Sequence, residues 1–145
     1  MSAMEAPVAP QADWLLNEHA IQAFAMSAIL LAAGYGWDAV RTPEALGLAA
    51  AKRLLGSAIT RNRLGPVLHS HRSGVLYWIV RTGSTSHYPT GCQLLRRGDW
   101  IAAPGDHALH PDIVRWLHLP EPGVLTSAVW LAAALHDTQL PGGTR

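Results

Sequence analysis

The sequence predicts an α+β domain whose mostly antiparallel sheet contains about four to six strands. Apolar residues recur at helical spacing near both ends of the chain, and they change to strand-like patterns in between. Short turns that contain glycine separate consecutive strands, which favours hairpins and therefore antiparallel pairing. The 145 residues suit one domain, expected over 13–138 between a flexible N-terminus (1–12) and a flexible tail (139–145).

The first expected element is a long amphipathic helix over residues 14–33, where apolar residues recur at helical steps. Asp13 fits its N-terminal cap, and Gly34 fits its end. A short strand is expected next, over residues 37–41, before the chain enters a second helix.

The second helix is expected over about residues 43–55. Thr42 fits its N-cap, and Pro43 suits the first helical position because that position needs no backbone donor. Glu44 would then place a negative charge at the positive end of the helix, and Gly56 would stop it.

The middle of the chain predicts a hairpin of residues 66–71 and 75–81, joined by a turn over 72–74. The run Val75 to Val80 is apolar on both faces, so it should be an interior strand covered on both sides.

The last third of the chain predicts a second hairpin, in which a turn over residues 96–99 joins residues 92–95 to 100–103. A further strand is expected over 113–119, followed by a C-terminal helix that Thr126 caps and that ends near residue 134 or 136.

Composition excludes several classes of protein. The net charge is only +1, so no overall electrostatic field points to nucleic acid. Cys92 is the only cysteine, which excludes an intrachain disulfide and suits a cytoplasmic location. The N-terminus lacks the basic region of a signal peptide, and no apolar run is long enough for a spanning helix, so no membrane partner is expected.

His69 and His71 are the most conspicuous pair of titratable residues. Side chains two positions apart on a strand point the same way, so both imidazoles could reach one metal ion. With Gly98, Asp99, Pro104 and a third histidine at His110, the spacing resembles that of cupins, small β-barrel metal proteins, and would imply a divalent metal held by His69, His71 and His110. The acidic ligand that cupins place shortly after the pair is missing here, which favours polar residues flanking a turn and no cofactor.

Arginines supply ten of the eleven basic residues, and Lys52 is the only lysine. Arginine makes bidentate contacts with phosphate, so Arg96 and Arg97, together with Arg61 and Arg63, are candidate phosphate contacts. Solvated turn and linker residues are the alternative explanation. The six tryptophans are spread along the whole chain, which is typical of core anchors rather than of a base-stacking platform.

Catalytic motifs are absent from the sequence. It contains no Asp-x-Asp pair, no phosphate-binding glycine loop and no Gly-x-Ser-x-Gly motif. The missing carboxylate pair argues against two-metal phosphoryl transfer, so the chain is expected to be non-catalytic.

Four segments together resemble a known family: GYGWDAVRTPEALGLAAAKRLL (34–55), LGPVLHSHRSGVLYWIVRTGS (64–84), TGCQLLRRGDWIAAPG (90–105) and VRWLHLPEPGVLT (114–126). They resemble the short actinobacterial proteins of the bifunctional DNA primase/polymerase, N-terminal-like type. The resemblance covers about residues 34–135 and implies the α+β core of archaeal–eukaryotic-type primases, an Asp-x-Asp metal pair and a Ser-x-His triplet that contacts nucleotide.

In this chain His69-Ser70-His71 and Tyr77-Trp78-Ile79 stand where the carboxylate pair would be, so the resemblance implies a copy without catalysis. Thr85-Ser86-His87 loosely matches the nucleotide triplet. The expected function is therefore nucleic-acid or nucleotide binding, or a regulatory interaction with another protein. The candidate binding residues are Arg61, Arg63, Arg96, Arg97 and His87.

Two alternatives stay open. One is a small metal-binding β-protein that uses the histidines. The other is a structural module that forms a homodimer through the apolar helix expected over 14–33.

Overall fold

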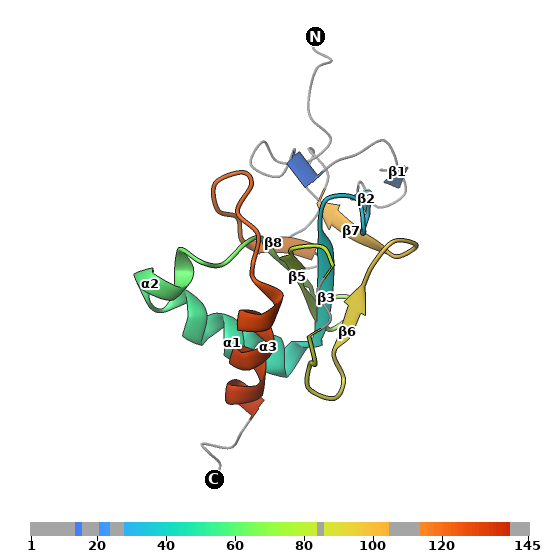
Figure 1. Ribbon diagram of the computed structural model, residues 1–145. Coiled ribbons are helices and arrows are strands. Elements are labelled where there is room, and N and C mark those ends of the chain that lie inside the picture. The colour runs from blue at the N-terminus through green and yellow to red at the C-terminus, as the bar shows by residue number, and fades with distance from the viewer. Residues whose placement is uncertain (1–13, 16–20, 24–27, 84–85, 105–113, 140–145) are drawn as a thin grey trace.

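The computed structural model describes residues 14–15, 21–23, 28–83, 86–104 and 114–139, which form two antiparallel sheets and three helices (Figure 1). The larger sheet has the strand order β6 (Gln93–Leu95), β3 (Asp38–Pro43), β5 (Val75–Val80), β4 (Val67–Ser70) and β8 (Val114–His118). The smaller sheet has the order β1 (Ile21–Ala23), β2 (Ala28–Ala32) and β7 (Trp100–Pro104).

The helices are α1 (Glu44–Leu55), the short α2 (Ala58–Arg61) and α3 (Ala128–Gln139). Figure 1 shows α1 and α3 side by side below the larger sheet, with the smaller sheet at the upper right. A buried cluster that includes Leu54, Trp78 and Leu131 joins these two helices to the larger sheet. Among the described residues, none of the helices combines the length and the apolar character needed to span a bilayer.

Strand β5 lies at the centre of the larger sheet, between β3 and β4. Its side chains alternate between two cores, as the geometry of a strand requires. Leu76, Trp78 and Val80 pack toward α1 and α3, whereas Ile79 belongs to the cluster that joins the two sheets. The prediction of an interior strand covered on both faces is confirmed.

The α+β class is confirmed, and so are several elements. The helix expected over about 43–55 is α1, the C-terminal helix is α3, and the hairpin around residues 72–74 is the antiparallel pair β4–β5. The strand expected over 113–119 is β8, which pairs with β4.

The long N-terminal helix expected over 14–33 is wrong. Strands β1 and β2 lie within that range, and β2 pairs along its whole length with β7. Leu31 is fully buried opposite Ile101, so pairing with a distant strand buries this apolar residue and overrides the local helical pattern. The dimerisation alternative depended on that helix and loses its basis.

The second expected hairpin is also wrong, although both of its strands exist. Strand β6 pairs with β3 in the larger sheet, and β7 pairs with β2 in the smaller one. The turn between them is tight: the Asp99 backbone N–H donates to the Arg96 carbonyl at 2.9 Å, and the Asp99 carboxylate accepts from the Arg96 N–H at 2.9 Å. The turn therefore carries the chain from one sheet to the other.

Thr42 does not cap α1. Its hydroxyl is buried and accepts a hydrogen bond from the Trp78 indole N–H at 3.0 Å, and Pro43 occupies the cap position. Glu44 is the first helical residue, and its backbone N–H donates to the Gly74 carbonyl at 3.0 Å. This contact fixes the start of α1 against the β4–β5 turn.

Candidate metal centre

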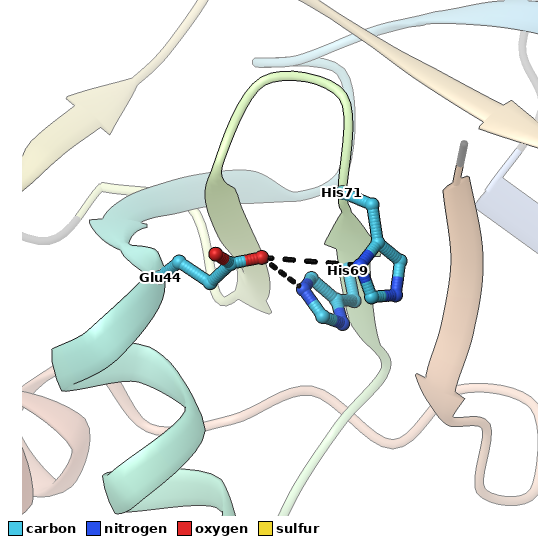
Figure 2. A group of neighbouring side chains, drawn as sticks. All are labelled: Glu44, His69 and His71. Carbon is cyan, nitrogen blue, oxygen red and sulfur yellow. Dashed lines mark hydrogen bonds and ion pairs between the residues drawn. The ribbon is translucent and has the colours of Figure 1, made fainter. Parts of the chain in front are cut away.

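Three potential metal ligands meet where α1 begins and β4 ends: Glu44, His69 and His71 (Figure 2). Pairing across three strands brings them together, because Pro43 lies opposite Val75, and Val75 lies opposite Ser70. Glu44, which follows Pro43, therefore reaches the same end of the sheet as His69 and His71, which flank Ser70.

The Glu44 carboxylate points at both imidazoles. Its Oε2 lies 2.8 Å from His69 Nε2 and 4.0 Å from His71 Nδ1. The two imidazole rings are 3.8 Å apart between centroids, with 35° between their planes. One ligand atom from each of the three residues lies within 4.8 Å of the other two.

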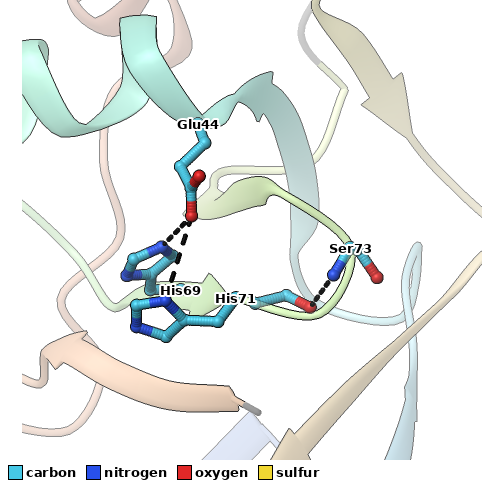
Figure 3. A network of polar contacts seen from close by, with 5 residues as sticks. Glu44, His69, His71 and Ser73 are labelled. Carbon is cyan, nitrogen blue, oxygen red and sulfur yellow. Dashed lines mark hydrogen bonds and ion pairs between the residues drawn. The ribbon is translucent and has the colours of Figure 1, made fainter. Parts of the chain in front are cut away.

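The β4–β5 turn holds His71 in this position. The Gly74 N–H donates to the carbonyls of Ser70 and His71 at 3.0 and 3.2 Å, and the Ser73 N–H donates to the Ser70 hydroxyl at 3.4 Å (Figure 3). Gly74 has φ +68°, a left-handed conformation that glycine adopts at little cost. The turn chemistry of Ser-His-Arg-Ser-Gly therefore orients one of the ligands.

The cluster is buried on one side and open on the other. His69 is 2% exposed, whereas the side chains of His71 and Glu44 are 40% and 39% exposed. Within the described part of the chain, His69 Nδ1 has no hydrogen-bond partner. Solvent and small solutes can thus reach the carboxylate and one imidazole while the other imidazole is fixed by packing.

The distances suit a transition metal after a small adjustment. Zinc binds imidazole nitrogen and carboxylate oxygen at about 2.0–2.2 Å, so tetrahedral ligand atoms lie about 3.3–3.5 Å apart. The observed 2.8 and 4.0 Å from Glu44 Oε2 bracket that value, so shifts of these atoms by well under an ångström would equalise the two distances. Three protein ligands leave at least one coordination position free.

The structure changes the composition of the predicted metal set. His69 and His71 lie together, whereas His110 lies outside the described residues. The acidic member is Glu44, which the sequence analysis assigned only to the helix end. The signal in the sequence for Glu44 was its place shortly after the strand expected over 37–41, which could pair beside the hairpin that carries the histidines.

The residues predicted to contact nucleic acid lie against different elements. Arg61 ends α2, and the Arg63 guanidinium lies 4.8 Å from the Trp130 ring of α3. The Arg97 guanidinium lies 4.4 Å from the ring of Tyr35, in the turn between β2 and β3.

Arg96 occupies the same turn as Arg97, between β6 and β7. The His87 carbonyl contacts His136 near the end of α3, at 3.2 Å. Arg96 and Arg97 therefore share one turn, Arg61 and Arg63 lie two positions apart along the chain, and these pairs lie against different elements.

Three titratable groups outside the cluster, among the residues that the structure describes, have shifted pKa values. Burial raises the pKa of the Cys92 thiol, which disfavours the nucleophilic thiolate. Burial also raises the pKa of Asp38, against the opposing effects of the Gly83 N–H and the Arg96 charge. Burial lowers the pKa of His118, the nearby Arg61 charge lowers it further, and a backbone hydrogen bond with Leu64 opposes both.

Comparison with models of protein families, with curated proteins and with solved structures finds no match to this chain. The resemblances to primase/polymerase-like proteins and to cupins therefore stay predictions, and the function has to be argued from the site itself.

Proposed function

We propose that this protein binds a divalent transition-metal ion through Glu44, His69 and His71. The observation that carries the proposal is the convergence of two imidazoles and one carboxylate, with ligand atoms within 4.8 Å of one another. A simple ion pair would use one histidine, whereas here a second ring lies 3.8 Å from the first and faces the same oxygen. Two imidazoles and one carboxylate that converge in this way can share one cation.

The ligand types define the class of metal. Imidazole favours zinc, iron, copper and nickel over magnesium and calcium, which prefer oxygen ligands. Two histidines with one carboxylate and an open position occur in sites for zinc and for iron(II). The half-exposed side of the cluster leaves the open position accessible to water or to a small ligand.

The test is a calorimetric titration of the full chain, stripped of metal, with zinc chloride. One equivalent of zinc is expected to bind to the wild type, and His71→Ala should weaken binding by at least about tenfold because it removes one of three ligands. His87→Ala is the matched control, because His87 is also an exposed histidine and lies near the end of α3, where its backbone carbonyl contacts His136. Equal zinc affinity of wild type and His71→Ala would contradict the proposal.

Nucleic-acid or nucleotide binding is a second proposal, supported by the turn between β6 and β7. Arg96 and Arg97 are exposed there, and the adjoining Trp100 is 41% exposed although it is large and apolar. Arginine beside exposed aromatic rings is a common arrangement in proteins that bind single-stranded nucleic acid. Binding of a labelled single-stranded oligonucleotide should weaken log-linearly with salt and fall in Arg97→Ala. No binding at low salt would exclude it.

A further inference from the structure

A second candidate site lies at the far end of β5 from the histidines. Two adjoining pockets of about 350 and about 410 Å³ share Arg81 and Ser127 among their lining residues. The larger pocket is also lined by Asn62 and Arg63, and the smaller one by Thr82 and Gly83. Volumes of this size are typical of sites for small molecules.

The lining residues favour an anion. Arg63 and Arg81 both face the larger pocket, and none of the described residues that line either pocket is acidic. Ser127 adds a hydroxyl. Its oxygen accepts a hydrogen bond from the Trp130 backbone N–H at 3.3 Å, so its own O–H can still donate to a ligand. Guanidinium groups donate in a fork that matches phosphate oxygens, which makes a phosphate group the best-fitting ligand.

Hydrogen bonds of the backbone fix the segments that line the two pockets. The Arg81 N–H donates to the Thr126 carbonyl at 3.2 Å, and the Thr126 N–H donates to the Ile79 carbonyl at 3.2 Å. The buried Thr126 hydroxyl accepts from the Gly65 N–H at 2.7 Å, which ties the segment before α3 to the segment before β4.

The Arg63 guanidinium is held over the Trp130 ring, 4.8 Å from its centroid. This stacking limits the freedom of its long side chain before any ligand arrives, so less entropy is lost when a ligand binds.

We propose that the larger pocket, which Arg63 and Arg81 line, binds the phosphate group of a small phosphorylated molecule. Val124 and Leu125 line the larger pocket and Val129 lines the smaller one, and they provide apolar surface for the organic part of such a ligand. The proposal is independent of the metal centre, because Arg81 follows β5 whereas the histidine turn precedes it.

The test is a calorimetric titration of the full chain at low ionic strength with inorganic phosphate, AMP, adenosine and a single-stranded DNA oligonucleotide. Saturable binding of phosphate and AMP, but not of adenosine, is expected. Arg81→Ala and Arg63→Ala should each weaken AMP binding by about tenfold or more, as expected for loss of a charged hydrogen-bond donor. Arg72→Ala is the matched control, because Arg72 is an exposed arginine in the β4–β5 turn at the opposite end of β5.

Several results would overturn the proposal: no saturable binding of phosphate or AMP, equal binding of adenosine and AMP, or affinity unchanged by both arginine substitutions. Binding of the oligonucleotide alone would point to a polymer and would equally reject a small ligand. Thermal unfolding of each variant, together with Arg63→Lys, which keeps the charge, separates loss of binding from loss of fold.

Discussion

Replacement of Glu44 by glutamine separates a metal ligand from a simple ion pair. His69 Nε2 lies 2.8 Å from the Glu44 carboxylate in the wild type. Glutamine keeps the length of the side chain and an oxygen that can accept a hydrogen bond from this nitrogen. It removes the negative charge and replaces the second carboxylate oxygen by an amide NH2 group. Because Glu44 is 39% exposed and glutamine keeps a hydrogen-bonding oxygen, the loss of the charge should change the free energy of unfolding of the metal-free protein by about 1 kcal/mol or less.

Metal affinity should respond much more strongly to the same change. A carboxylate ligand carries the charge that compensates the cation, and a neutral amide oxygen does not. Changes even to groups one step removed from a metal typically cost about 10–100-fold in affinity, so Glu44→Gln should weaken zinc binding by at least about that factor.

The assay combines urea unfolding of the metal-free variant with competition for zinc against a chromophoric chelator. Glu121→Gln is the control, because Glu121 is an exposed glutamate in the loop before α3. The reasoning is refuted if Glu44→Gln binds zinc as tightly as the wild type. It is also refuted if the variant loses several kcal/mol of metal-free stability, since the cluster would then serve the fold.

Three further predictions concern the fold. Thr42→Val keeps the side-chain shape but leaves the buried Trp78 N–H without its partner, so urea unfolding should show a loss of about 1–3 kcal/mol. Gly34→Ala should cost about 2–3 kcal/mol or more, since Gly34 has φ +91° and a Cβ there would clash with the backbone nitrogen of Arg97. Gly36→Ala, with φ +100° but open space around it, should cost less. Because burial lowers the pKa of His118 in the folded state, the unfolded chain takes up this proton first as the pH falls. Stability should therefore drop from about pH 7 to about pH 5, and by less in His118→Gln, measured by unfolding across that range; an identical drop in the variant would reject this assignment.

The elements predicted correctly are those whose signals are local. Helix α1, the β4–β5 hairpin and the apolar strand β5 each depend on spacing, turn residues or composition within about a dozen residues. The errors concern pairing between distant segments. Residues 28–32 have a helix-compatible pattern, and their pairing with β1 and with the distant strand β7 makes them a strand.

The candidate site shows the same limit of local patterns. His69 and His71 were visible because strand alternation places residues two apart on one face. Glu44 was not recognised as a ligand, because it precedes His69 by 25 residues and reaches it only through the register of β3, β5 and β4. Local sequence patterns carry no information about that register until the strands are paired.

The most direct measurement is an anomalous difference map from crystals of the full chain soaked in zinc, recorded on both sides of the zinc absorption edge. The account predicts a peak about 2.0–2.2 Å from one nitrogen each of His69 and His71 and from a Glu44 carboxylate oxygen. A zinc peak elsewhere, with Glu44 still hydrogen-bonded to His69 and no density between the rings, would contradict it.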